Sequence, residues 1–182
     1  MAAVAVRLFA VPGRGRKALS RGGAPTAKNG AGPTLFYLDD LEVGQRFVSG
    51  SHELDAAQIK AFAGQFDPQP FHLDEAAAEN TMFGGLAASG WHTAAITMKL
   101  MVEGGAPLAG GLIGAGGELR WPRPTRPDDR LHVESEIIEI APSRSRPERG
   151  MVTVRSETIN QRGEVVQAMT AKLVVPRRPA AG

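Results

Sequence analysis

The chain has no cysteine among its 182 residues. It therefore has no disulfides, no thiol nucleophile and no Cys-ligated metal, which is compatible with a reducing compartment. Long hydrophobic runs are also missing: a membrane helix needs about 20 consecutive apolar residues, so we expect no membrane association. What remains, 42% hydrophobic and 22% charged residues, is ordinary for one globular domain with a single core.

Acidic residues are absent from positions 1–38, which hold six of the 21 basic residues. Residues 39–182 hold 15 basic against 19 acidic residues, so the domain itself is acidic and the overall charge of +2 comes from the tail. Nucleic-acid binding would require positive charge on the folded part. We therefore expect no nucleic-acid partner.

The N-terminal tail has nine Gly or Pro among its first 33 residues and almost no apolar periodicity. Such a segment cannot bury enough surface to offset its chain entropy. We predict disorder at 1–35 and at the short end 177–182, around a domain at 36–176. The apolar start is too short for a secretory signal, so we expect a cytoplasmic protein, with a mitochondrial transit peptide as the alternative reading of the basic tail.

Hydrophobic patterns predict an α+β domain in which an antiparallel sheet wraps a long helix. Asp55 and Gln58 form a capping box, which starts a helix that ends at Phe66. Residues 89–103 are apolar nearly all round, which predicts a buried helix with Trp91, Met98 and Met101 in the core, or else along an acyl tunnel. The expected strands are 47–54, 118–121, 131–140, 151–160 and 164–175, the last two joined as a hairpin.

The segment 66–72, Phe-Asp-Pro-Gln-Pro-Phe-His, places a carboxylate and an imidazole five residues apart. Each proline fixes its own φ at about −65° and pushes the preceding residue toward extended geometry, so the segment cannot continue the helix before it. Asp67 and His72 on this braced bend can hold a water molecule and move its protons. The alternative is structural: Asp67 caps a turn and His72 packs as a half-buried histidine.

Residues 62–93 resemble the MaoC-like dehydratase family, relatives of (R)-specific enoyl-CoA hydratases that carry an Asp-x-Asn-Pro-x-His signature. The chain has this pattern from Asp67 to His72, with Gln69 in the place of Asn. The resemblance extends over residues 36–175 and includes a Pro-rich turn at 120–124. It implies a single hotdog domain.

The resemblance also implies the reversible addition of water to trans-2-enoyl-CoA, which gives (R)-3-hydroxyacyl-CoA. Asp67 would deprotonate the water and His72 would donate a proton to C2. The N–H of Gly90 and neighbouring Ser89 lie at a helix N-terminus, where they would polarise the thioester oxygen. Gln69 would lie on the substrate side, and no cofactor is expected besides the acyl-CoA substrate.

Two other functions stay open. Related hotdog proteins are acyl-CoA thioesterases, which often place a carboxylate on the central helix, whereas residues 86–102 contain no Asp or Glu. A non-catalytic acyl-CoA-binding subunit is the other alternative, which the change at Gln69 keeps open and the presence of Asp67 and His72 opposes.

The other candidate side chains are expected to be structural. His52 and His132 are expected at the surface, and His92 in the core or an interface, with a place in the pocket as the alternative. No two histidines have the i, i+4 spacing of a helical metal pair, so no metal is predicted. The arginines near residue 146 predict a solvated turn, or else a clamp for CoA phosphates.

A single domain of this kind leaves a long sheet edge open. Pairing two copies covers such an edge, so we predict a homodimer or a higher even assembly.

Overall fold

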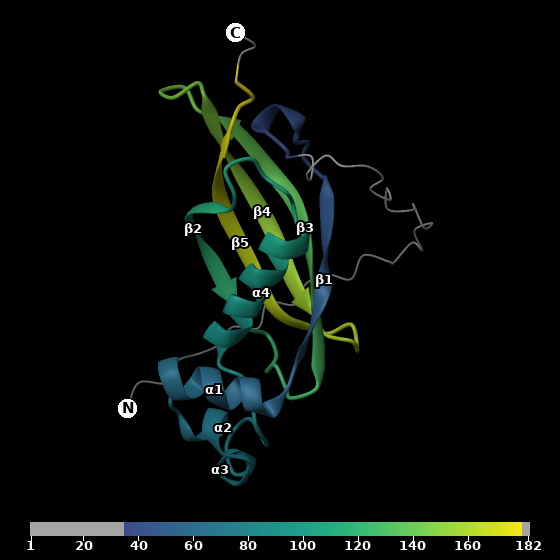
Figure 1. Cartoon of the computed structure of the whole chain (residues 1–182), viewed down its shortest axis with the longest axis vertical. Coiled ribbons are helices and arrows are strands. Elements are labelled where there is room, and N and C mark those ends of the chain that lie inside the picture. The colour runs from purple at the N-terminus through teal and green to yellow at the C-terminus, as the bar shows by residue number, and fades with distance from the viewer. Residues whose placement is uncertain (1–34, 180–182) are drawn as a thin grey trace. The chain divides into compact units, whose positions relative to one another are not determined.

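Five antiparallel strands form one sheet that curves around the helix α4 (Figure 1). The structure is a computed structural model and describes residues 35–179. Nearly all of the predicted tail, and residues 180–182, lie outside the described part, so their predicted disorder stays a prediction. The elements in chain order are η1 (Leu38–Asp40), β1 (Arg46–Leu54), α1 (Ala56–Phe66), α2 (Pro70–Leu73), α3 (Glu75–Glu79), α4 (Gly90–Gly104), β2 (Ile113–Arg120), β3 (Asp129–Pro142), β4 (Arg149–Ile159) and β5 (Val165–Pro176).

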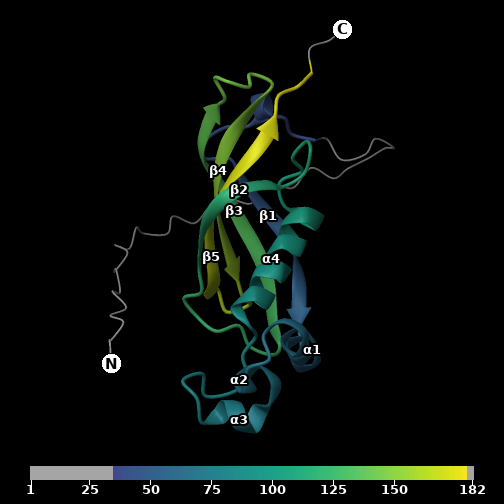
Figure 2. The same ribbon diagram turned by 90° about the vertical axis from the view of Figure 1, so that its left-hand side faces the viewer.

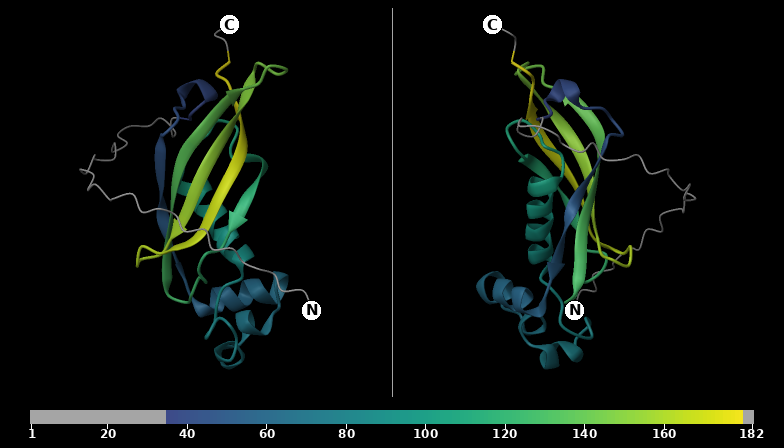
Figure 3. Two further views of the ribbon diagram at one scale, coloured as in Figure 1. Left: turned by 180° about the vertical axis from the view of Figure 1, so that it is seen from behind. Right: turned by 45° about the vertical axis from the view of Figure 1, so that its right-hand side comes forward.

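The strand order is β1-β3-β4-β5-β2, so β1 and β2 are the edges (Figure 3). The predicted hairpin is confirmed: β4 pairs with β5 from Arg149↔Pro176 to Ile159↔Val165. Strand β2 begins five residues earlier than expected, at Ile113. Its glycine-rich start has low strand propensity, but pairing with β5 holds it in the sheet.

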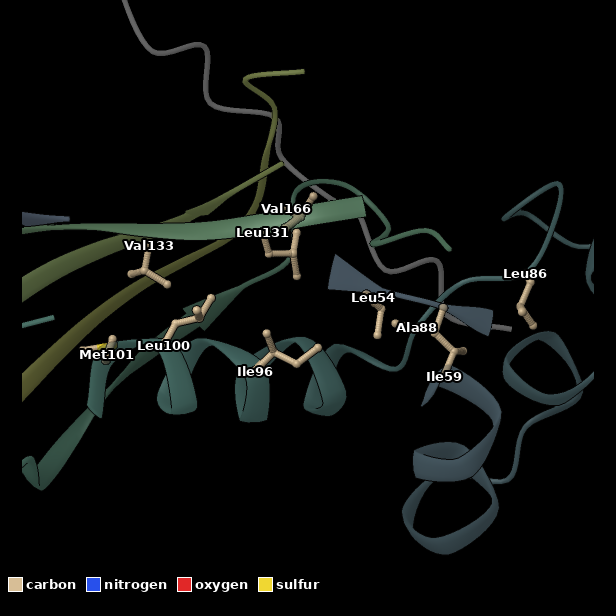
Figure 4. Close-up of a cluster of buried hydrophobic side chains, with 10 residues drawn as sticks. All are labelled: Leu54, Ile59, Leu86, Ala88, Ile96, Leu100, Met101, Leu131, Val133 and Val166. Carbon is tan, nitrogen blue, oxygen red and sulfur yellow. The ribbon is translucent and has the colours of Figure 1, made fainter. Parts of the chain in front are cut away.

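Helix α4 lies against one face of the sheet (Figure 2). Ile96, Leu100 and Met101 point from α4 to Leu131 and Val133 on β3 (Figure 4). The predicted core position of Met101 is therefore confirmed. Each large buried side chain contributes roughly 1.5–3 kcal/mol, so this contact fixes the helix on the sheet.

The prediction that α4 is buried nearly all round is wrong. Trp91 is 64% exposed, Met98 46% and Val102 67%. The reason is architectural: the sheet covers one side of the helix, and α1 adds a contact through Phe62 on His92, which leaves these three side chains uncovered (Figure 2). The sequence signal of an all-apolar helix here marks a face without a partner in the single chain.

A buried polar network joins α4 to the sheet. The Thr97 hydroxyl pairs with the Thr158 hydroxyl at 2.6 Å and accepts from Gln167 Nε2 at 2.9 Å. Gln167 Oε1 in turn accepts from the indole N–H of Trp121 at 2.9 Å. Thr97, Thr158 and Gln167 are at most 1% exposed, so every one of these groups needs the partner it has.

Three short helices gather at the N-terminal end of α4 (Figure 1). The predicted capping box is confirmed: Asp55 Oδ1 accepts from the Gln58 N–H at 2.7 Å, and α1 ends at Phe66. Residues 70–73, expected to be part of a bend, form the helical turn α2 instead. Proline lacks an N–H and has a helical φ, which suits the first position of a helix, and Pro70 occupies that position.

Arg177 and Arg178, in the C-terminal end that was predicted to be disordered, contact the domain. The Arg177 N–H donates to the Glu148 carbonyl at 2.8 Å. The Arg178 guanidinium pairs with Asp40 at 2.7 Å and lies 4.7 Å from the ring centroid of Tyr37. In residues 35–179, no helix has the length and apolar character needed to cross a membrane.

Candidate active site

Asp67 and His72 face each other across the link between α1 and α2. Asp67 is the residue at which α1 ends, and Pro70 starts the turn that carries His72. The Gln69 carbonyl accepts from the His72 N–H at 2.9 Å, which tightens the link. His72 Nε2 lies 3.4 Å from Asp67 Oδ2. The carboxylate and the imidazole predicted from the motif are thus brought together.

A backbone carbonyl fixes the proton on the His72 ring. His72 is 4% exposed, and its Nδ1 lies 2.7 Å from the Ala87 carbonyl oxygen. A carbonyl can only accept, so Nδ1 carries the hydrogen of this bond. In the neutral ring Nε2 is then an acceptor, and it is Nε2 that faces Asp67.

The Asp67 carboxylate is held in its ionised form. A hydrogen bond from the Ser89 hydroxyl is the largest cause that lowers the pKa of Asp67. Burial opposes this effect, whereas the Gln69 side chain, which donates to Oδ1 at 2.7 Å, and the nearby His72 lower the pKa further. When the His72 ring is neutral, its Nε2 and the Asp67 carboxylate present two acceptors to the same space.

Helix α4 points its N-terminus at this pair. The Ser89 side chain accepts from the Trp91 N–H at 3.2 Å, and its carbonyl accepts from the Thr93 N–H at 3.1 Å. The N–H of Gly90, the first residue of α4, has no intrahelical acceptor. It is the donor available to a ligand at this helix end.

All five predicted site residues line one pocket of about 500 Å³. The other lining residues are mainly aromatic side chains, prolines and threonines: Phe71, Met82, Phe83, Ala88, Trp91, Thr93, Trp121, Pro122, Arg123, Pro124 and Thr125. Such a pocket, apolar with a few polar groups at defined positions, is typical of a small-molecule site.

The sequence model of the family described as MaoC like domain matches residues 41–161. The chain belongs to the MaoC-like domain family. The crystal structure of a MaoC-like dehydratase from Rhodospirillum rubrum is 67% identical, with a TM-score of 0.78 and alignment over 79% of this chain and 99% of that one. The fold of this MaoC-like domain is thereby the predicted hotdog fold.

Two curated relatives extend the comparison. An uncharacterized protein of Bacillus subtilis, YdeM, is 39% identical over 69% of this chain and 88% of its own length. The 3-hydroxybutyryl-CoA dehydratase of Methylorubrum extorquens is 32% identical over 62% of this chain and 70% of its own. The family match, the Methylorubrum dehydratase and the Rhodospirillum dehydratase structure support a place for this domain in a family of hydratases and dehydratases.

One wall of the pocket, formed by Trp121, was not predicted from the sequence. Trp121 lines the pocket and packs against α4: a Cβ atom on Gly90 would lie 2.7 Å from Trp121 Cε2. Glycine at position 90 is therefore required by the indole ring, a reason that differs from the expected close approach of a ligand. Trp91, expected in the core, lies beside Trp121 with ring centroids 5.5 Å apart.

The remaining histidines lie away from the pair. His92 stacks flat on Phe62, with centroids 4.5 Å apart, and is not among the pocket residues. It is 8% exposed, which agrees with the expected place in the core. His52 and His132 are partly exposed. The described residues contain no group of three or more His, Cys, Asp or Glu side chains that could hold a metal ion.

The arginine-bearing turn between β3 and β4 lies at the opposite end of the sheet from the α4 N-terminus (Figure 1). Arg144 and Arg146 thus face no part of the pocket in their own chain. The clamp for CoA phosphates at this turn stays a prediction.

His92 predicts a dependence of stability on pH. Burial, and secondarily His52, lowers the pKa of His92 to about 4, and its Nδ1 has no partner. The folded state therefore binds a proton at His92 less readily than the unfolded chain does. The contribution of neutral His92 to the free energy of unfolding is complete above pH 6.5 and is lost as the pH falls toward 4, a change of roughly 3 kcal/mol. We expect His92→Phe, which keeps the stack on Phe62, to weaken this dependence of the free energy of unfolding on pH, measured by urea titrations. His132→Phe should leave the dependence unchanged.

The contact between Gly90 and Trp121 can be tested by a double-mutant cycle. We expect Gly90→Ala to lower the free energy of unfolding by roughly 1–3 kcal/mol, because its methyl group meets the indole ring. In a Trp121→Ala background the same change becomes neutral or stabilising, since alanine favours the helix. Gly64→Ala on α1, with nothing within 4 Å of its Cβ, is the matched control. Additive effects in the cycle would contradict the steric assignment.

Proposed function

We propose that this protein catalyses the reversible addition of water to a trans-2-enoyl-CoA, giving an (R)-3-hydroxyacyl-CoA. The observation that carries the proposal is the pair of acceptors, Asp67 Oδ2 and His72 Nε2, which lie 3.4 Å apart at the pocket wall. A water molecule has two O–H donors and one nucleophilic oxygen. It can donate to both acceptors while its oxygen faces the substrate.

The tautomer assigns the proton transfer mainly to His72. As the water oxygen bonds to C3, Nε2 takes one water proton and the C2=C3 electron pair moves toward the thioester. The Nε2–H then delivers the proton to C2, which restores neutral His72. Asp67, whose lowered pKa makes it a poor proton carrier, orients the water and stabilises the imidazolium. This role differs from the expectation that Asp67 is the base.

The Gly90 N–H supports the negative charge that develops on the thioester oxygen. Preorganised donors at such a position often raise the rate roughly 10²–10³-fold, which corresponds to roughly 2.7–4 kcal/mol of transition-state stabilisation. Gln69 holds the carboxylate by its side chain, so the amide that replaces the usual Asn of the signature serves Asp67. The chemistry is acid–base throughout and requires no cofactor beyond the CoA thioester itself.

The (R) stereochemistry is proposed from the resemblance to (R)-specific enoyl-CoA hydratases, and the CoA thioester from a curated relative. The Methylorubrum relative is a 3-hydroxybutyryl-CoA dehydratase, which performs the reverse reaction on such a substrate. The thioesterase alternative has less support, because α4 carries no carboxylate before Glu103, near its C-terminal end.

Hydration can be followed as loss of enoyl-thioester absorbance with crotonyl-, octenoyl- and branched enoyl-CoA, with free thiol measured in parallel. We expect absorbance loss without thiol release. Asp67→Asn and His72→Gln should each lower turnover by roughly 10²–10⁴-fold, and the double variant by little more, because the two groups act as one unit.

The matched controls make the same kinds of substitution elsewhere on the molecule. Asp55→Asn, at the other end of α1, retains its helix cap, and His132→Gln lies on β3 outside the pocket. Both should keep wild-type rates. Thiol release would identify a thioesterase, and near-normal rates for both site variants would refute the assignment of Asp67 and His72.

We also propose a homodimer. Seven of the eight residues of the edge strand β2 are exposed, including Ile113 at 51%. Met98 and Val102 add an exposed apolar stripe on α4. A second copy would cover an open strand edge and exposed apolar surface of this kind.

Sedimentation equilibrium tests this assembly. We expect a dimer for the wild type and a monomer for the double variant Met98→Glu/Val102→Glu, because charges on the stripe would have to be buried without partners. Val43→Glu, at another site that is 64% exposed, should remain dimeric. A wild-type monomer at micromolar concentration would contradict the proposal.

A further inference from the structure

Arg126 binds three carbonyl groups of one loop. Its Nη1 donates to the carbonyls of Gly85 at 2.7 Å and Leu86 at 3.0 Å, and its Nη2 donates to the carbonyl of Phe83. The carbonyls converge because Gly84 and Gly85 have φ values of +58° and +138°, which favour glycine. A planar guanidinium suits such a set of fixed acceptors better than an ammonium does.

The loop that Arg126 holds leads directly to the catalytic pair. The next residue, Ala87, supplies the carbonyl that accepts from His72 Nδ1 at 2.7 Å. The Ala87 N–H donates to the Phe71 carbonyl at 3.3 Å, and the Ala88 N–H to the Thr125 carbonyl at 2.9 Å. The segment from the loop to Ser89 thus lies between Arg126 and the His72 ring.

Arg126 is itself anchored in the domain. Its backbone N–H donates at 2.9 Å to Asp129 Oδ2, and Asp129 is fully buried. The carboxylates nearby pair with other arginines: Asp129 with Arg162, and Glu164 with Arg123. Within the described residues no ion pair uses the Arg126 guanidinium, so its hydrogen bonds serve the loop.

We propose that Arg126 is a positioning residue for His72: by clamping the carbonyls of residues 83–86 it holds the Ala87 carbonyl against Nδ1 and keeps Nε2 directed at Asp67. If the clamp loosens, the Ala87 carbonyl moves away and the Nε2–H tautomer becomes competitive. In that tautomer Nε2 carries a hydrogen and cannot take a proton from the water. The consequence for turnover rests on the proposed hydration, whereas the tautomer itself does not.

The test uses the full-length protein with ¹⁵N-labelled histidine, at a mildly alkaline pH where the neutral rings dominate. Long-range ¹H–¹⁵N spectra distinguish the two tautomers, and His72→Gln assigns the His72 signals. We expect Nδ1–H for His72 in the wild type and a mixture with Nε2–H in Arg126→Lys, which cannot span three carbonyls. The kcat should fall roughly 10- to 100-fold, with KM changed less than about threefold.

A second variant perturbs the loop and leaves Arg126 in place. Gly85→Ala puts a side chain at a φ of +138° and should displace the carbonyls with the same effect on the His72 tautomer. Arg130→Lys, exposed and outside the pocket, should change neither tautomer nor rate.

Three results would overturn the proposal: an Nε2–H tautomer in the wild type, an unchanged tautomer in folded Arg126→Lys, or an unchanged tautomer in Gly85→Ala. If Arg126→Lys does not fold, the wild-type and Gly85→Ala spectra decide. Tautomer changes as expected, in a protein that hydrates no enoyl-CoA, would refute the proposed function and leave the positioning role of Arg126 standing.

Discussion

The position of Asp67 is set by two helices at once. Asp67 ends α1, and its carboxylate accepts from Ser89, the residue that caps α4. The carboxylate and the Ser89 hydroxyl that stabilises it are 22 positions apart in the sequence and meet only in the folded chain. The lowered pKa of Asp67 and the pocket that Asp67 and Ser89 both line depend on this meeting of helix ends.

Local signals in the sequence predicted much of this arrangement. The capping box at Asp55 fixed the start of α1, and the prolines after Asp67 fixed its end. Alternating strands and the glycine-bearing hairpin predicted the order of the last strands. The five proposed site residues lie at helix ends and in the link between helices, where caps and prolines give the strongest sequence signals. All five line one pocket.

Contacts between distant segments could not be read from the sequence. The exposure of Trp91 and Met98 depends on which side of α4 the sheet covers, which an all-apolar helix does not encode. The indole ring of Trp121 is held at the pocket by its hydrogen bond to Gln167, which is 46 positions away. The tautomer of His72 depends on a carbonyl, and backbone carbonyls have no signature in a sequence.

The buried network of Thr97, Thr158 and Gln167 has a geometric consequence for the whole site. If α4 slid along its axis by one residue, Thr97 would leave its partners, and each buried polar group left unpaired would cost roughly 1–3 kcal/mol. Apolar packing alone tolerates such small displacements better, because it is not directional. The network therefore fixes the axial position of α4 on the sheet, and it sets how far the first residue of α4 reaches into the pocket.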